Sequence, residues 1–515
     1  MDLETIEMSD LPTMRGNNFY LDYLSGENSA RDFITHGPMD FAEAIKARGE
    51  FTYPRRAVSG LLSNYNNSLG AGKLALDNCK LIEHDNTYCV ITGQQVGFMG
   101  GPLYSLYKII TAIRLAEHLQ ENYEGNFIPV FWGATEDHDF HEINHVHHIK
   151  NDGELGKISF KWNEIGKPVS DLELNQSITE AYNEYLDLIK PGDGNVDDVF
   201  VHGAHTNYAD WKMSIWSKMF SGRGLVVVTP ELLRGEATSF FQQAHKSHAA
   251  IRTLLDDTGE ALLENGYSAS LAAPEYGSLY TFNDGYRIRV AEHDVSSAEI
   301  EADPNKFSTD AALRPLLADM LLPTCASVLG PGEVSYQAML KPVYQLFNIP
   351  QPVLFPRLSY TVVEANDHRV LDKYHTDIFH AVSGYPVQSL FEQIIPDVLN
   401  HSDTVLSIEP LVLPAGLSPK GIIHLRNEHR IKYEIALKKE SKKHAFYIKK
   451  AMKEKGFTKG EVQRLRNRLF PKNGMQERML PMTHFLAIYG KGFIVSFFEN
   501  GQLFDFCHNI LYLED

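Results

Sequence analysis

YCVITGQQVGFMGGP, residues 88–102, is the stretch that decides the fold class of this chain. It begins with an apolar run rich in β-branched side chains, which is typical of a buried strand. A glycine-rich turn, residues 93–101, follows, and Pro102 stands where we expect the first position of a helix. Helical spacing is then kept by Leu103, Leu106, Ile110, Ile113 and Leu119. With a second strand predicted at Phe127–Trp132, this order forms a βαβ unit and predicts a parallel sheet.

The same pattern recurs about two hundred residues downstream. Cys325–Leu329 reads as a strand, Gly330–Glu333 as a turn, and Val334–Phe347 as a helix that Pro342 could kink. Pro352–Phe355 reads as the next strand. Between the two units the sequence predicts one further strand, at Leu225–Thr229, and helices over residues 211–220 and 230–264. We therefore expect an α/β fold, a Rossmann-like doubly wound parallel sheet interrupted by insertions.

Composition shifts along the chain predict three parts. Residues 1–365 form the nucleotide-binding core, with insertions near 151–210 and 231–310. Residues 366–475 form a helical coiled-coil domain, because His424–Lys472 is rich in Lys and Glu with apolar residues at helical spacing. Those apolar residues are Ala445, Ile448, Met452, Val462, Leu465 and Leu469. Residues 476–515 form a C-terminal segment that returns to the core.

The overall composition excludes several function classes. The chain has 515 residues, 43% of them hydrophobic, and a formal net charge of -18, which disfavours nucleic acid as a partner. Its four cysteines form no CxxC pair, so neither a disulfide scaffold nor a thiolate metal site is expected. No signal peptide and no apolar run long enough to span a membrane is visible, so we expect a cytoplasmic protein.

The glycine-rich turn is the first candidate site. A turn between a strand end and a helix start presents free N–H groups and the positive end of a helix dipole, which suit a phosphate. Its spacing matches neither the dinucleotide fingerprint nor the P-loop, and a purely structural turn is an equal alternative. Lys108, on the following helix, could reach a phosphate or simply be exposed to solvent.

The second candidate, residues 134–145, follows the second strand and gathers six ionisable side chains between Glu136 and Glu142. A polar binding site and a solvated acidic loop are both open. The segment contains His141-Glu142-Ile143-Asn144-His145, the HExxH pattern of zinc hydrolases. No third ligand stands out, so a zinc hydrolase is a minor alternative.

The second turn supplies the third candidate. Glu333 could contact a ligand or cap its helix. Arg357, after the next strand, could clamp a carboxylate or phosphate, or form a surface ion pair. The basic stretch Lys438–Lys472 is expected to be a solvated helical face.

These motifs, in this order, resemble the bacillithiol-biosynthesis cysteine-adding enzyme family (BshC) over nearly the whole chain. The strings that carry the resemblance are ITGQQ (91–95), GPLY (101–104), VFW (130–132), TEDHDF (135–140), EINH (142–145), LLPT (321–324), GPGE (330–333), PRLS (356–359) and QER (476–478). The resemblance implies a core like that of class I aminoacyl-tRNA synthetases, with connective insertions and a coiled coil that supports a homodimer. It also implies a ligase that joins L-cysteine to glucosaminyl-malate in the last step of bacillithiol synthesis.

Amide formation requires activation of the cysteine carboxyl, so we expect ATP, with Mg²⁺ as a possible companion and no protein metal site. From position, the expected catalytic residues are Asp137, His138 and Asp139. The expected substrate-binding residues are Gln94, Gln95, Tyr104, Trp132, Glu136, Asn144, Glu333, Tyr336 and Arg357. The expected nucleotide-binding residues are Gly93, Gly97, Gly100, Gly101, Lys108, Gly330 and Gly332. A zinc hydrolase and a non-catalytic nucleotide-binding scaffold stay open as alternatives.

Overall fold

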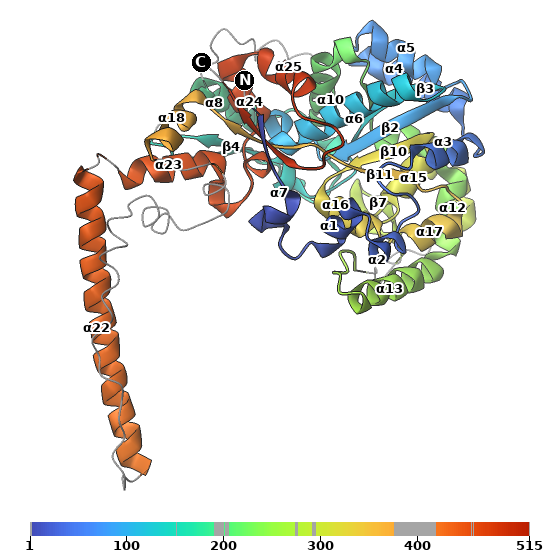
Figure 1. The fold of residues 1–515 in the computed structure, drawn as a ribbon. Helices are drawn as coiled ribbons and strands as arrows, with labels where there is room; N and C mark the ends of the chain where they lie inside the picture. The colour runs from blue at the N-terminus through green and yellow to red at the C-terminus, as the bar shows by residue number, and fades with distance from the viewer. Residues whose placement is uncertain are drawn as a thin grey trace.

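A five-stranded parallel sheet forms the centre of the protein (Figure 1). The computed structural model describes residues 3–150, 152–189, 200, 205–272, 277–290, 295–374, 378, 419–454, 456 and 458–513. The strand order is β11-β10-β2-β3-β6, and every neighbouring pair is parallel. The strands are β2 (Thr87–Gln94), β3 (Asn126–Gly133), β6 (Val226–Val228), β10 (Thr324–Leu329) and β11 (Val353–Pro356). The predicted Rossmann-like sheet is confirmed.

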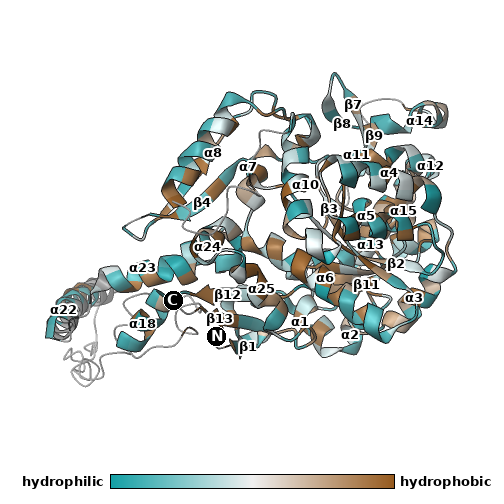
Figure 2. Cartoon of the chain, turned by 90° about the horizontal axis from the view of Figure 1, so that it is seen from above, coloured by the Kyte–Doolittle hydropathy of each residue, from teal (hydrophilic) through white to brown (hydrophobic). Residues whose placement is uncertain are grey.

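Helices cover both faces of this sheet, as a doubly wound fold requires. Alternate strand residues enter two separate hydrophobic clusters: Val90 packs on the face that carries α6, and Ile91 on the face that carries α15 and α17. The helices before the C-terminal part are α1 (Asn18–Ser25), α2 (Asn28–Arg31), α3 (Phe41–Gly49), α4 (Arg55–Ser68), α5 (Lys73–Leu81), α6 (Leu103–Asn122), α7 (Phe140–Ile143), α8 (Gln176–Ile189), α10 (Tyr208–Met219), α11 (Pro230–Leu233), α12 (Thr238–Lys246), α13 (His248–Glu264), α14 (Ser297–Ala302), α15 (Arg314–Leu321), α16 (Pro331–Gln337) and α17 (Lys341–Phe347). Figure 2 shows hydrophobic colour on the central strands and α6, and hydrophilic colour on outer helices such as α5.

Proline explains two differences from the predicted helices. Pro102 is the N-cap of α6 and not its first residue. The helix predicted over Val334–Phe347 is two helices, α16 and α17. Pro342 lies in the first turn of α17, where its missing N–H costs no helical hydrogen bond, so a new helix can start there but the first could not run through it. The helical segment predicted over residues 230–264 is also divided, into α11, α12 and α13, although no proline lies at either break.

Two small antiparallel sheets are formed by the chain between strands β3 and β10 of the central sheet. The antiparallel pair β4 (His145–Ile149) and β5 (Leu155–Ser159) follows α7. The strands β7 (Leu279–Asn283), β8 (Tyr286–Arg289) and β9 (Phe307–Thr309) form a second antiparallel sheet, in the order β8-β7-β9. Residues 151, 190–199 and 201–204 of the first predicted insertion, and 273–276 and 291–294 of the second, lie outside the described residues.

The C-terminal part combines a projecting helix with a return to the core. The helix α22 (Pro419–Glu454) extends away from the body in Figure 1. It is preceded by α18 (Ala365–Lys373) and followed by α23 (Lys459–Leu469), α24 (Met482–Tyr489) and α25 (Gly492–Glu499). The last strand, β13 (His508–Tyr512), pairs with β12 (Ser359–Val363) and β1 (Leu3–Ile6) in a sheet that the sequence did not predict.

The apolar pattern expected for the coiled coil divides into two sets. Val462, Leu465 and Leu469, on α23, are buried. The side chains of Ala445, Ile448 and Met452, on α22, lie outside the described part of the chain, as do residues 375–377 and 379–418 of the predicted domain. No helix among the described residues combines the length and the apolarity that crossing a bilayer requires.

Candidate active site

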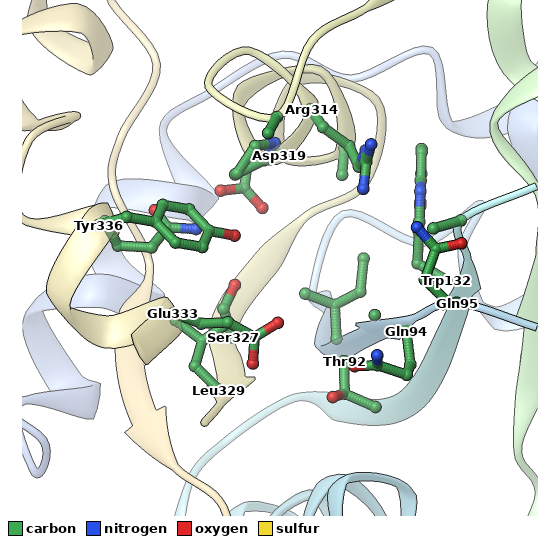
Figure 3. Close-up of a pocket in the computed structure, with 17 residues that line it drawn as sticks. Thr92, Gln94, Gln95, Trp132, Arg314, Asp319, Ser327, Leu329, Glu333 and Tyr336 are labelled. Atoms are coloured by element: carbon green, nitrogen blue, oxygen red, sulfur yellow. The ribbon is translucent and has the colours of Figure 1, made fainter. Parts of the chain in front are cut away.

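A cavity of about 270 Å³ opens at the carboxyl edge of the sheet (Figure 3). Ligands bind at this edge of open α/β sheets because the loops that leave parallel strands meet there. Strand β2 and the residue after it contribute Gly93, Gln94 and Gln95, β3 contributes Trp132, and α15 contributes Arg314 and Asp319. The segment from β10 into α16 contributes Leu329, Glu333, Tyr336 and Gln337. Gly93, Gln94, Gln95, Trp132, Glu333 and Tyr336, all expected at the site, therefore line one cavity.

Lys108 ties the two strand–turn–helix units together. Its buried amino group donates to the carbonyl of Gly93 at 2.9 Å, to Gln94 Oε1 at 2.9 Å and to Glu333 Oε1 at 2.7 Å. Burial lowers the pKa of Lys108, and the Glu333 carboxylate opposes that shift. With its donors engaged in this way, Lys108 positions the turns and does not extend toward a phosphate.

The remaining glycines of the first turn do not form a phosphate cradle. Gly97, Gly100 and Gly101 do not line the cavity, and Gly100 and Gly101 are buried. A Cβ placed on Gly100 would lie 2.2 Å from Met482 Cε, so α24 packs directly on the turn. The N–H of Leu103, at the start of α6, donates to the carbonyl of Leu480 at 2.9 Å. The expectation for these glycines is therefore corrected: the C-terminal segment occupies the space that a phosphate would need.

Asp137 is surrounded by positive charge at the edge of the cavity. Its carboxylate accepts from Arg314 and Gln95, and Arg287 Nη1 lies 3.4 Å from Oδ1. Arg287 comes from β8 and Arg314 from α15, so both an insertion and the core hold this one side chain. Asp137 contacts two residues that line the cavity, although it is not itself part of the lining.

The neighbours of Asp137 lie outside the cavity lining. His138 and Asp139 are exposed, and His138 Nδ1 lies 3.4 Å from Arg287 Nη1. Partial burial and the Arg287 charge lower the pKa of His138, which keeps its imidazole neutral at pH 7. Glu136 is 1% exposed and accepts from Arg234 Nε at 2.7 Å, so it faces the protein interior and not a substrate.

The HExxH pattern does not form a zinc site. Helix α7 ends at Ile143, and His145 is already the first residue of β4, so His141 and His145 do not lie on one helical face. Across the described residues, no group of three His, Cys, Asp or Glu side chains could hold a metal ion. Asn144, expected to contact substrate, instead lies at the base of the β4–β5 hairpin, within 3.5 Å of the Phe160 carbonyl. The string therefore lacks the one-helix arrangement in which zinc hydrolases use it.

Arg357 and Tyr104 support the site from behind its lining. Arg357 is buried and pairs with Glu477, with Nη1 3.0 Å from Oε2, so its ion pair is an internal one and not the surface pair that was the alternative to a ligand clamp. The guanidinium carbons of Arg357 and Arg478 each lie 5.8 Å from the centre of the Tyr104 ring. The Tyr104 hydroxyl accepts from Gln94 Nε2 at 3.2 Å, so Tyr104 orients a residue of the lining.

The second turn is open where the first is closed. Glu333 caps α16 by accepting from the N–H of Gly330 at 2.7 Å, and the same side chain lines the cavity. Nothing lies within 4 Å of a Cβ built on Gly332. Gly330 and Gly332 both lie outside the cavity lining.

Sequence reasoning missed several residues of the site. Arg314, Asp319 and Gln337 line the cavity and belong to none of the motifs that the sequence singled out. Asp319 is buried, accepts from the Tyr344 hydroxyl at 2.6 Å and lies 3.5 Å from Arg48 Nη2. Burial raises the pKa of Asp319, and the Arg48 charge opposes that rise. A carboxylate within the otherwise apolar stretch of α15 was a weak signal that could have identified it.

Comparison with known proteins decides the family. The model named Bacillithiol biosynthesis BshC, N-terminal Rossmann-like domain, matches residues 1–358. The chain belongs to the BshC family. The model of the family's C-terminal coiled-coil domain matches residues 446–513, which confirms the expected coiled-coil domain.

Curated members of the BshC family resemble this chain along most of its length. A protein of Natranaerobius thermophilus named "Putative cysteine ligase BshC" is 28% identical, covering 92% of this chain and 93% of its own length. A protein of the same name from Anoxybacillus flavithermus is 27% identical, with 99% and 100% coverage. One from Heliobacterium modesticaldum is 30% identical over 65% of this chain and 68% of its own length.

Proposed function

We propose that this protein is a cytoplasmic ligase that joins L-cysteine to glucosaminyl-malate by an amide bond, in the last step of bacillithiol biosynthesis. The observation that carries the proposal is the match to relatives named as cysteine ligases over nearly the whole chain. The cavity supports it, because residues of the ITGQQ string line the cavity and Asp137 of the TEDHDF string contacts its lining.

ATP is proposed on chemical grounds. A carboxylate and an amine do not condense in water without activation, and ATP supplies that activation through an acyl-adenylate or acyl-phosphate. The residues around the cavity do not fit a triphosphate. Lys108 is engaged by Gly93 and Glu333, the lining carries the carboxylates of Asp319 and Glu333, and Met482 fills the space over Gly100. We therefore assign neither ATP nor Mg²⁺ to particular residues.

The protein's own residues suggest how the attacking amine loses its proton. His138 has a lowered pKa and is neutral at pH 7, as a general base must be. It lies beside Arg287, which also contacts Asp137. We propose that His138 takes the proton at the mouth of the site, and that Asp137 holds Gln95 and Arg314 in the lining.

We also propose that the functional protein is a homodimer formed through α22. Ile431, Ile435 and Phe446 are large apolar side chains of this projecting helix and are 51%, 62% and 64% exposed. Ile431 and Ile435 are one helical turn apart, and Phe446 follows about three turns later, so they can share one stripe. Analytical ultracentrifugation tests this: Ile435→Lys should convert a dimer to a monomer, whereas Lys439→Gln should not.

The decisive test is the thiol content of cells with and without the gene. Mass spectrometry should show bacillithiol lost and glucosaminyl-malate accumulated in the deletion strain. Unchanged bacillithiol would contradict the proposal. The purified chain should form the amide and consume ATP when cysteine and glucosaminyl-malate are supplied; binding of ATP without consumption would instead identify a nucleotide-binding scaffold.

Asp137→Asn provides the matched test of the site. Loss of the charge leaves Arg314 and Arg287 without their carboxylate partner, so thiol synthesis should fall about tenfold or more. Asp152→Asn, on the exposed turn between β4 and β5, is the control and should leave synthesis unchanged. Full synthesis with Asp137→Asn would remove that aspartate from the mechanism.

A further inference from the structure

Three buried polar atoms of the cavity lining have no hydrogen-bond partner among the described residues. They are Trp132 Nε1, Gln337 Oε1 and Gln95 Oε1. Trp132 and Gln337 are each only 3% exposed. Because buried polar groups in folded proteins are almost always hydrogen-bonded, atoms left open around a cavity indicate what a ligand supplies. All three atoms border the same cavity, so the molecules bound there together can supply their missing hydrogen-bond partners.

The chemistry of these atoms limits the ligand. The indole N–H of Trp132 can only donate, so the ligand must present an acceptor to it. The oxygen of Gln95 can only accept, and its orientation is fixed because Gln95 Nε2 donates to the Asp137 carboxylate. Gln337 Oε1 likewise accepts. The bound molecules must therefore bring an acceptor to Trp132 and N–H or O–H donors to the two glutamines.

The charges of the lining are already balanced by the protein. Arg314 pairs with Asp137, Glu333 lies 2.6 Å from Lys108, and Asp319 lies 3.5 Å from Arg48. A ligand with a large net charge would enter this site without compensation, and burying an uncompensated charge is unfavourable. A ligand that carries one positive and one negative group and no net charge meets no such penalty.

The arrangement of the lining also has a direction. Figure 3 shows the carboxylates of Asp319 and Glu333 and the hydroxyl of Tyr336 on one side of the cavity. Trp132 and Gln95 lie on the opposite side, and the guanidinium of Arg314 points in between. The first side presents oxygen acceptors to an ammonium group, and Trp132 together with the Arg314 guanidinium offers donors to a carboxylate.

We propose that this cavity is the subsite for a zwitterionic α-amino acid, held with its ammonium group toward Gln337 and Asp319 and its carboxylate toward Trp132 and Arg314. The inference rests on the proposed function, which makes cysteine the amino acid. The apolar side chains of Ile91 and Leu329 then form the wall for its short side chain. In this orientation the carboxylate lies next to Gln95, whose open oxygen accepts from the attacking amine of the second substrate.

Calorimetry on the full chain, with cysteine and two analogues, tests the orientation. Cysteamine lacks the carboxylate and 3-mercaptopropionate lacks the ammonium group. Each should bind about tenfold more weakly than cysteine, because each leaves one side of the cavity unpaired. Equal affinity of 3-mercaptopropionate and cysteine, or no binding of cysteine, would overturn the proposal.

Two substitutions, Trp132→Phe and Gln337→Met, should weaken the binding of different analogues. Trp132→Phe keeps an aromatic ring and removes the N–H, so it should weaken cysteine about tenfold and leave cysteamine unchanged. Gln337→Met removes the acceptor, so it should weaken cysteine and cysteamine and leave 3-mercaptopropionate unchanged. Gln337→Glu, which adds a charged acceptor, should preserve or strengthen cysteine binding and serves if the methionine variant does not fold.

The remaining source of an ammonium group is the amino sugar of glucosaminyl-malate. If Gln337→Met abolishes glucosaminyl-malate binding and leaves cysteine unaffected, the subsite belongs to the sugar and our assignment is wrong. Failure of the proposed function is distinguishable: cells without the gene would then keep bacillithiol, whatever the binding data show. If cells without the gene lose bacillithiol but Trp132→Phe and Gln337→Met bind cysteine normally, the proposed subsite is refuted and the proposed function is not.

Discussion

The two strand–turn–helix units of the core are alike in sequence and differ in what covers them. Both turns leave parallel strands at the same edge of the sheet, after β2 and after β10. The first is closed, because Met482 packs on Gly100 and Leu480 accepts from the start of α6. The second leads into the cavity through Glu333 and leaves Gly332 uncovered. Only the beginning of the first turn, Gly93 to Gln95, therefore lines the cavity, because the C-terminal segment packs on its later glycines.

The comparison extends to how each turn is held. The segment that closes the first turn is anchored by Glu477, whose carboxylate pairs with Arg357 and accepts from Ser359 Oγ at 2.8 Å. The second turn is held by the Lys108–Glu333 pair, which reaches across from α6. Four substitutions test how the two turns are held, and they follow in order of their expected effect on stability, the largest first.

Glu477→Gln should have the largest effect on stability. It leaves the buried Arg357 guanidinium without its carboxylate, and breaking a buried ion pair costs about 3–5 kcal/mol. Urea denaturation should show a matching fall in the free energy of unfolding. Arg478→Gln, one residue on and exposed, should change it by less than about 0.5 kcal/mol. An unchanged midpoint for Glu477→Gln would mean that this pair does not anchor the segment.

His508 should make the same anchor sensitive to acid. It is buried, with Nδ1 2.8 Å from Ser359 Oγ and Nε2 2.9 Å from Thr361 Oγ1, and burial lowers its pKa to about 4. The folded state thus binds the proton more weakly than the unfolded state. The contribution of His508 to the free energy of unfolding is complete above pH 6.5. It is lost as the pH falls toward 4, and the loss amounts to up to about 3 kcal/mol.

The measurement is urea unfolding of the wild type and His508→Gln between about pH 7 and pH 4.5, the window in which the unfolded-state histidine takes up its proton. The difference between the two proteins isolates the histidine, because Glu231, whose pKa burial raises to about 7, titrates in both. The variant should lose less stability on acidification than the wild type does. Parallel pH curves would show that His508 is not the sensitive group.

Gly100→Ala should destabilise the closed turn by about 2–3 kcal/mol. Gly100 has a φ of 86°, which costs an L residue about 1–2 kcal/mol, and the new Cβ would meet Met482. Gly332→Ala is the matched change in the open turn and should cost less than about 1 kcal/mol, since nothing lies near its Cβ. Thermal unfolding of both variants compares them directly. Equal losses would erase the distinction between the turns.

Lys108→Met should have the smallest effect on stability and a clear effect on activity. The substitution removes hydrogen bonds to both turns and a buried charge, and the Glu333 carboxylate that it leaves is 30% exposed and can be hydrated, so the net cost is about 1 kcal/mol. Glu333 is then released from its place in the cavity, and kcat/KM for amide formation should fall about tenfold or more. A loss of stability as large as that of Glu477→Gln, or normal kcat/KM, would contradict a positioning role.

Much of the fold was predictable because its signals are local. The short runs of small and apolar residues before Gly93 and Gly330 are strands, and the glycines between strand and helix allow the chain to turn. Two such units predict parallel pairing, and parallel strands bring their carboxyl ends to one edge. For that reason the sequence alone predicts that Gly93, Asp137 and Gly330 converge at this edge; Gly93 lines the cavity there, whereas Asp137 contacts its lining and Gly330 lies outside it.

Tertiary structure alone decided which of these residues line the cavity. Met482 closes the first turn and Glu477 engages Arg357 from more than a hundred residues away, and neither contact leaves a local pattern in the sequence. Asp319 and Gln337 enter the cavity because α15 and α16 pack over one face of the sheet. The sequence by itself determined where the site lies, since periodicity and turn chemistry act over a few residues. The composition of the site depended on long-range packing, which no local spacing records.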